Sequence, residues 1–566
     1  MNKINNGAGI ATLLFVAGAL FTQAQAAAPG ITGTGTDGAF NLVANEAYIT
    51  QPDGQSVYSW GYGCSTAPTS AEFKPATIAG GFCNNMQLPG PTLVVTEGQT
   101  VTVTLTNNLP GAAGNTSILF PGFNVTTSCS ATTAVGVQGL LTCEAASGGT
   151  VSYTFKAVSP GTRAYYSGTQ GDLQVEMGLY GSIIVLPKAA PAACGSTYAG
   201  IPPSTASSGL PGNSGNNAKA KSFWNEKDFR LAPAAYDHGE TCYDREYLFQ
   251  FSEMDPNIHT QALAQVTALK GCLAGAQGCS LNVPTEPYHP AYFMINGRSM
   301  PDDMDPNYAV QYQHQPYNGN PHMHPGEITL LRIVGQGRWQ HPFHEHANHV
   351  RILARDGNLL LSQTTPASGD PALAGPLMFT TTTTPGLAMD GLFYFTGKGL
   401  NWDMYGHEGT SSSNDPNALL PCTPDVNGYN TSAVTAVNYF EWCQDHKKPL
   451  QASPFGDVPS GGPVTLPDPN IILNGAWYGG SPYLGPNATT RATFGSTTCS
   501  SGNCPSTTGT TPPSGTIANN PSGEAGFAFM WHSHNEREIT TNNIFPGGML
   551  MMMLVDSREF VIDESN

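Results

Sequence analysis

Histidine spacing is the strongest chemical signal in this sequence of 566 residues. Of 14 histidines, seven fall between residues 314 and 349: His314, His322, His324, His341, His344, His346 and His349. Two more form the segment His532-Ser533-His534. Neutral imidazole is a preferred ligand of copper, zinc, iron and nickel. The spacing therefore predicts a transition-metal site.

Two of these histidine pairs adjoin apolar runs typical of strands. Alternate side chains of a strand share a face, so His344 and His346 project from one side, as do His532 and His534. If the two strands are neighbours, four imidazoles converge on one patch, enough to hold one ion or to help hold two. Glu345 would face the opposite side.

The alternative interpretation is a histidine-rich surface, or histidines that are hydrogen-bonded in a polar core. Two His-x-His pairs in one domain, each beside an apolar strand, favour the metal site. A third pair, His322-Met323-His324, precedes a Pro-Gly turn and is a weaker candidate, because it can simply cap that turn.

Strand-like runs come in two series. Gly (65) and Pro (45) are abundant while only 11% of residues are charged, which is typical of short strands joined by many turns. The first series covers 56–60, 92–96, 100–105, 151–155 and 181–186, and the second covers 245–251, 292–296, 328–334, 349–354, 391–395, 527–531 and 548–555. This pattern predicts an all-β chain of two β-sandwiches.

The predicted domain organisation follows from the composition between these runs. It comprises a signal peptide (1–26), a first sandwich (38–187), a linker (188–239), a second sandwich (240–400 and 521–560) and a loop-rich insertion (401–520).

The N-terminus and the cysteines indicate an exported protein. A short polar start with Lys3, an apolar run at 10–21 and Ala24-Gln25-Ala26 are typical of a cleaved secretory signal, which predicts a secreted or periplasmic location. No later segment is long and apolar enough to span a bilayer, so no membrane insertion is expected.

All 12 cysteines lie in the exported part, and none has the C-x-x-C spacing of a zinc site, so disulfides are favoured. The sequence does not fix their connectivity. Short polar loops favour neighbour pairing: Cys64/Cys83, Cys129/Cys143, Cys194/Cys242, Cys272/Cys279, Cys422/Cys443 and Cys499/Cys504.

The formal net charge of −18 argues against a nucleic-acid partner, which needs a basic surface. The expected partner is a small-molecule or metal-ion substrate, and formation of a homo-oligomer is left open.

Several motifs together resemble the multicopper oxidase family. The segment 339–346 (WQHPFHEH) resembles the family's His-Pro-x-His-x-His signature, and 531–534 (WHSH) resembles its final His-Cys-His strand. The segments 88–92 (LPGPT) and 97–101 (EGQTV) resemble the opening of its first domain. The resemblance implies two cupredoxin-like Greek-key sandwiches, the second with the long insertion, and copper as the cofactor.

The resemblance also implies roles for five histidines as metal ligands. His344 resembles the type 2 copper ligand, whereas His346, His532 and His534 resemble type 3 ligands. His341 resembles a type 1 ligand. No other cofactor and no catalytic residue is assigned.

The departures from the family pattern concern two copper centres. Ser533 stands where the family has the thiolate ligand of its blue copper, and Glu538 stands where it has a histidine. A hydroxyl cannot replace a soft thiolate, so no blue copper centre is expected. No histidine precedes His238; the segments 117–121 and 165–167 occupy the positions of the first-domain histidines.

Three functions stay open. The first is a secreted copper oxidoreductase of multicopper-oxidase type that oxidises an unknown substrate at a reduced, histidine-bound copper site. The others are a non-catalytic copper-binding protein and a structural cupredoxin-like protein. The retained histidine pairs argue against the last, and the lost cysteine argues against ordinary laccase turnover. G-x-S-x-G, Walker and H-E-x-x-H motifs are absent.

Overall fold

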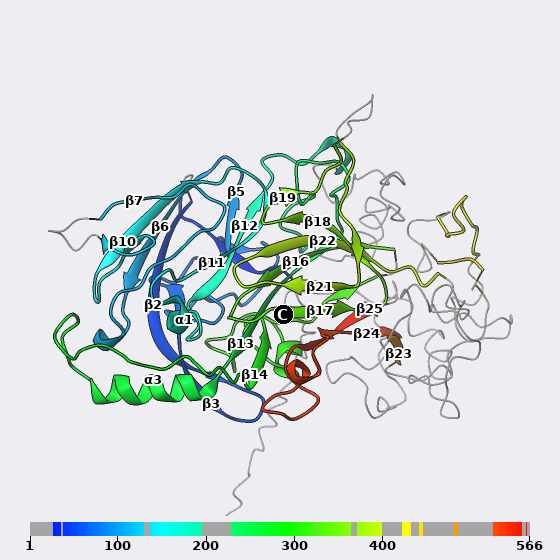
Figure 1. The fold of residues 1–566 in the computed structure, drawn as a ribbon. Coiled ribbons are helices and arrows are strands. Elements are labelled where there is room, and N and C mark those ends of the chain that lie inside the picture. Colours follow the sequence, from blue (N-terminus) through cyan, green and yellow to red (C-terminus); the bar gives the residue numbers. More distant parts are fainter. Residues whose placement is uncertain are drawn as a thin grey trace, which may run out of the picture.

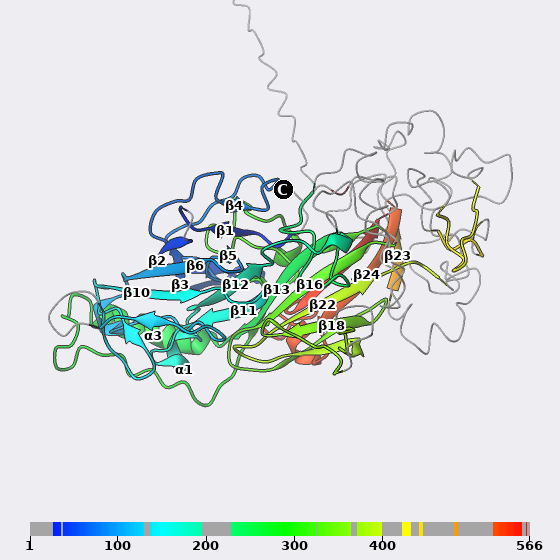
Figure 2. The same cartoon turned by 90° about the horizontal axis from the view of Figure 1, so that it is seen from above.

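Two β-sandwiches lie side by side in the computed structural model (Figures 1 and 2), which confirms the predicted all-β, cupredoxin-like fold. The structure describes residues 27–35, 38–129, 136–194, 228–324, 326–363, 371–398, 421–431, 441–444, 446, 480–484, 525–556 and 562. The predicted signal peptide and most of the predicted linker and insertion lie outside these residues, and the predicted domain boundaries stay predictions.

The first sandwich consists of two five-stranded sheets. One has the order β11-β12-β5-β1-β4, with β11 (Gly161–Tyr166), β12 (Tyr180–Leu186), β5 (Leu93–Thr96), β1 (Gly30–Thr32) and β4 (Phe73–Lys74). The other has the order β3-β2-β6-β10-β7, with β3 (Ser56–Cys64), β2 (Ala39–Thr50), β6 (Thr100–Asn107), β10 (Thr150–Lys156) and β7 (Thr126–Thr127). A separate pair is formed by β8 (Val137–Gln138) and β9 (Cys143–Glu144).

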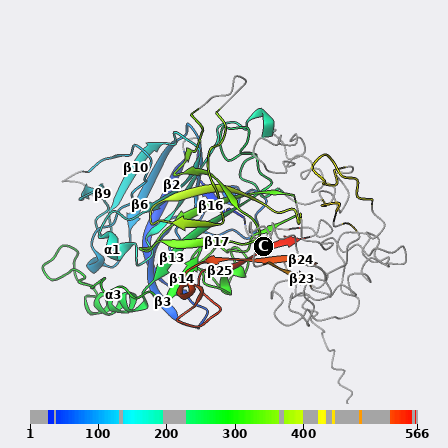
Figure 3. The same cartoon turned by 45° about the vertical axis from the view of Figure 1, so that its right-hand side comes forward.

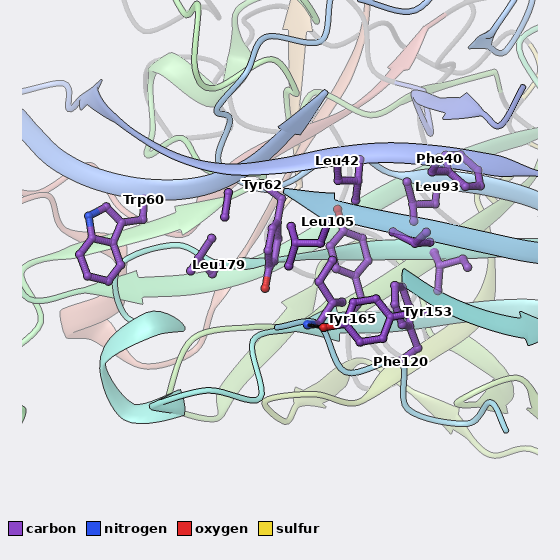
Figure 4. Close-up of a cluster of buried hydrophobic side chains, with 14 of the residues drawn as sticks. Phe40, Leu42, Trp60, Tyr62, Leu93, Leu105, Phe120, Tyr153, Tyr165 and Leu179 are labelled. Carbon is purple, nitrogen blue, oxygen red and sulfur yellow. Dashed lines mark hydrogen bonds between the residues drawn. The ribbon is translucent and has the colours of Figure 1, made fainter. Parts of the chain in front are cut away.

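Aromatic side chains fill the space between these two sheets, as Figure 4 shows. Trp60, Tyr62, Tyr153 and Tyr165 are all fully buried. Strand β6 shows why the sequence folds this way, since its buried and partly exposed residues alternate along the strand. Burial of large side chains at 1.5–3 kcal/mol each, roughly, stabilises the sandwich.

The second sandwich has a seven-stranded and a six-stranded sheet. The larger has the order β14-β13-β16-β22-β18-β19, with β20 on β18; these are β14 (Tyr292–Ile295), β13 (Arg245–Met254), β16 (Ile328–Gly335), β22 (Ala388–Tyr394), β18 (Val350–Arg355), β19 (Asn358–Leu359) and β20 (Leu377–Met378). The smaller has the order β15-β25-β24-β17-β21, with β23 on β24; these are β15 (His322–Met323), β25 (Leu550–Asp556), β24 (Ala525–Ser533), β17 (His341–Glu345), β21 (Thr380–Thr383) and β23 (Gly480–Leu484).

Helices are few. Helix α1 (Gly171–Gln174) is one turn, whereas α3 (Pro256–Ala268) has 13 residues and was not predicted. The Asp255 side chain accepts a 2.9 Å hydrogen bond from the Asn257 amide and so caps α3, with Pro256 as its first residue. Ile258 and Ala262 pack into the core of the first sandwich. The helix therefore fixes the second half of the chain to the first.

Buried polar contacts join the sandwiches directly. Thr162 of β11 donates a 2.6 Å hydrogen bond to Asp390 of β22 and accepts one of 3.1 Å from Arg332 of β16. Ser182 of β12 donates a 2.7 Å bond to Gln250 of β13. Since polar groups buried this deeply need partners, these contacts fix how the two sandwiches face each other.

Five of the six predicted disulfides are present: Cys64–Cys83, Cys129–Cys143, Cys194–Cys242, Cys272–Cys279 and Cys422–Cys443. Cys499 and Cys504 lie outside the described residues. Among the residues that the structure describes, no helix is long and apolar enough to cross a membrane.

Candidate metal centre

The four histidines of the two His-x-His pairs lie on two adjacent strands or directly after them: His344 and His532 are within β17 and β24, and His346 and His534 follow the strand ends. Strands β17 and β24 pair antiparallel, with His344 opposite His532 and Phe343 opposite Ser533. Figure 3 shows these strands in the second sandwich, where β24 lies between β17 and β25. The predicted adjacency of these strands is therefore confirmed.

The period of the strands brings all four imidazoles to one face. The ring centre of His344 lies 4.7 Å from that of His346, 5.6 Å from that of His532 and 4.9 Å from that of His534. The rings of His346 and His532 are 5.1 Å apart. Phe379 packs edge-on against His344 at 5.6 Å and forms an apolar neighbour to the cluster.

Hydrogen bonds orient two of these rings. His532 Nδ1 lies 2.6 Å from the Ser533 carbonyl oxygen, which can only accept, so Nδ1 carries the proton. In a neutral ring this leaves a lone pair on His532 Nε2, and that atom lies 3.1 Å from His346 Nε2. A carbonyl that holds one ring nitrogen while the other faces the site is the usual support for a metal-binding histidine. His344 Nδ1 is similarly 2.7 Å from the Thr380 hydroxyl.

Burial favours the uncharged form of two of the four rings, His344 and His532. His344 and His346 are 3% and 7% exposed, His532 is partly buried and His534 is exposed. Burial, together with repulsion from His532 and His534, lowers the pKa of His344 to about 4. Burial also lowers the pKa of His532. Because only the neutral ring offers a lone pair, these residues are prepared to bind a metal at neutral pH.

The four rings do not yet converge on a single point. Within the described part of the chain, only Cys422, Glu441 and His446 bring three potential ligand atoms within 4.8 Å of one another. Cys422 is bonded to Cys443 in a disulfide and offers no thiolate, so that group is not a metal site. The donor set of the four histidines fits copper, but closure on one ion requires at least one ring to rotate.

His341, the fifth predicted ligand, lies apart from this cluster. It is fully buried, and its Nε2 and Nδ1 lie 2.8 Å from Glu253 and 2.9 Å from Glu538. Burial alone would lower the pKa of His341, but the hydrogen bonds and charges of these two carboxylates raise it to about 9. Both ring nitrogens are held by carboxylates, and a metal could bind only if one of these contacts broke. A ligand role for His341 stays a prediction that this arrangement does not support.

Ser533 and Glu538 belong to the same network. The Ser533 hydroxyl donates to the Glu538 carboxylate, whose other oxygen accepts a 2.9 Å bond from the Asn535 side chain. His341, Ser533 and Glu538 are the positions at which the family resemblance placed a blue copper site. An ion pair with hydrogen bonds occupies that place here.

His322 and His324 lie elsewhere. They are buried at β15, which β25 separates from β24 in the sheet order. Sequence reasoning missed Glu253, which lies 88 positions from His341 in a fully buried strand and has no motif of its own.

Known proteins with similar structures include copper enzymes. No curated protein matches the chain. Among solved structures, the multicopper oxidase mgLAC is 14% identical, covering 91% of this chain and 85% of its own, with a TM-score of 0.40. A blue copper oxidase from Nitrosomonas europaea has the same identity and coverage, with a TM-score of 0.41. A copper nitrite reductase from Nitrosomonas europaea is 17% identical, covering 63% of this chain and 84% of its own, with a TM-score of 0.34.

The family assignment comes from the first sandwich. Residues 68–190 match the family model described as multicopper oxidase, a family whose members use copper. This match covers much of the first sandwich and supports a multicopper oxidase assignment for that part of the chain.

Proposed function

We propose that this protein is an exported copper oxidoreductase that holds copper with His344, His346, His532 and His534 and has no blue copper centre. The observation that carries the proposal is the clustering of these four imidazoles on one face of the β17–β24 pair, with the other three ring centres 4.7–5.6 Å from that of His344. Bound copper would supply a one-electron redox centre that can accept an electron from a small-molecule or metal-ion substrate.

The chain's own residues prepare this site in three ways. The Ser533 carbonyl fixes the tautomer of His532, so that its Nε2 lone pair faces His346. The Thr380 hydroxyl holds His344. Burial favours the neutral form of His344 and His532, and neutral imidazoles need lose no proton before they bind copper.

The network around His341 favours a second candidate function, which is copper binding without turnover. In place of an electron-transfer copper, the protein has an ion pair of His341 with Glu253 and Glu538. Without a relay, electrons must reach the histidine-bound copper directly from the substrate. A copper-binding protein without turnover is the alternative, and oxygen uptake by the copper-loaded protein with candidate reductants distinguishes the two.

The proposed location of the protein is outside the cytoplasm, after export. The N-terminal segment has the composition of a signal peptide, and five disulfides are stable only in an oxidising compartment. N-terminal sequencing of the mature protein tests this, with a start near Ala27 expected.

The copper site is tested by equilibrium dialysis against Cu(II) with metal analysis. The wild type is expected to retain stoichiometric copper, and a double variant His346→Ala/His532→Ala is expected to lose it while staying folded. The matched control is His289→Ala/His314→Ala, which removes two imidazoles away from β17 and β24. Unchanged affinity in the first variant would place the site elsewhere.

A further inference from the structure

A cleft of about 290 Å³ lies between the two sandwiches, and no residue of the histidine cluster lines it. The first sandwich contributes Leu119, Tyr166 and Val175 to its wall. The second contributes the loop 336–338 and the turn at 385–386. Its size is near the lower end for small-molecule sites, which occur preferentially where domains meet.

This cleft lies where the first sandwich has lost its histidines. By the family resemblance, 117–121 and 165–167 are the segments that would have carried imidazoles, and Leu119, Tyr166 and Ser167 from those segments line the cleft. The Leu119 amide donates a 2.8 Å hydrogen bond to the Tyr166 carbonyl, so the two segments form one wall. That wall presents the aromatic ring of Tyr166 and the aliphatic side chain of Leu119, where the family resemblance would place histidines.

Charges near the cleft are already paired. Arg338 is the one charged side chain among the lining residues, and its guanidinium lies 2.6 Å from Glu286, donates a 2.9 Å bond to the Thr285 carbonyl and packs over the Tyr288 ring. Behind the wall, Glu253 accepts bonds from the Arg338 and Trp339 amides. With neither charge free to pair with a ligand, the cleft favours an uncharged molecule.

Two glycines that line the cleft have little or no room for a side chain. A Cβ on Gly386 would lie 3.1 Å from the Tyr166 ring, and one on Gly337 would lie 2.4 Å from Glu253. Both have positive φ, of +79° and +68°, so other residues would be strained there. At the opposite side, a Cβ on Gly171 would meet nothing within 4 Å, so that position is open.

We propose that this cleft binds a small, planar, uncharged aromatic molecule that packs against the Tyr166 ring. Its apolar wall, glycine-lined surface and paired charges fit such a ligand. The proposal does not involve copper and stands independently of the proposed function.

The test measures binding of indole to the full-length, copper-free protein by saturation-transfer NMR and calorimetry. Saturable binding is expected, weakened about tenfold in Tyr166→Leu because an aromatic contact is lost, and abolished in Gly171→Trp because the new side chain enters the open space. Gln261→Trp, on the exposed face of α3, is the matched control and should bind like the wild type. Thermal unfolding establishes that each variant is folded.

Two results would overturn the proposal. One is the absence of saturable indole binding by the wild type, and the other is wild-type affinity in both folded variants. Indole-3-acetate, the anionic analogue, is expected to bind more weakly than indole. Tighter binding of this anion would show that Arg338 is free to pair with a ligand and would overturn the uncharged ligand class.

Discussion

Replacement of Glu538 by alanine removes one of the two carboxylates that hold the His341 imidazolium. Glu538 is 1% exposed and His341 is fully buried, so neither charge is screened by water. The change leaves His341 with Glu253 alone and removes the acceptor of the Ser533 hydroxyl. Both consequences lower the stability of the second sandwich.

The expected loss is large. Removal of one partner from a buried ion pair typically costs about 3–5 kcal/mol, and the loss is expected toward the lower end here because Glu253 still compensates the charge of His341. For a cooperative unit of roughly 200 residues, this corresponds to a decrease in Tm of roughly 6–20 °C. Glu538→Gln, which keeps a hydrogen-bond acceptor without the charge, should fall between the wild type and Glu538→Ala.

The assay is thermal unfolding followed by tryptophan fluorescence, with Glu286→Ala as the control. Glu286 lies 2.6 Å from Arg338 but its side chain is 70% exposed, and such surface pairs contribute at most about 1 kcal/mol. A Glu538→Ala variant that melts within 2 °C, roughly, of the Glu286→Ala variant would contradict the view that an ion network has replaced a metal here.

Three further predictions follow from the same structure. Copper-loaded protein should lack the intense band near ~600 nm that copper–thiolate bonding gives, because Ser533 offers no sulfur; an absorption spectrum checks this. The pKa of His341 is raised to about 9 from an unfolded value near ~6.5. Its contribution to stability is therefore fully present below pH ~6.5 and is lost as pH rises through about 9, a decrease of about 3 kcal/mol that urea unfolding at pH 6 and pH 10 measures. Finally, thiol titration of the unfolded, unreduced protein should detect no free cysteine at the five described disulfides; one or more reactive thiols per chain would contradict this pairing.

Much of the fold could be predicted because burial of alternate residues is local information. In β6 every second residue is buried, so period-two alternation identifies the strand directly. Helix α3 escaped because its buried side chains are only Ile258, His259 and Ala262, which leave a weak helical period. Strand β2 escaped because runs of buried residues interrupt its alternation.

One part of the candidate site could likewise be predicted from the sequence, and another part could not. The His344/His346 and His532/His534 pairs could be predicted from spacing, since a strand's geometry sets which side chains share a face. The network around His341 could not, because its partners lie 88 and 197 positions along the chain and are brought together by packing alone. The cleft between the sandwiches likewise depends on how two separately folded segments meet.

The most direct measurement of the central claim is pulsed EPR of the copper-loaded protein, which counts the imidazole nitrogens coupled to Cu(II). The account predicts coupling to several imidazoles in the wild type. It also predicts loss of this coupling in His346→Ala/His532→Ala and an unchanged spectrum in His289→Ala/His314→Ala. Copper without imidazole coupling, or coupling that survives the first double variant, would contradict a copper site built from the four histidines of β17 and β24.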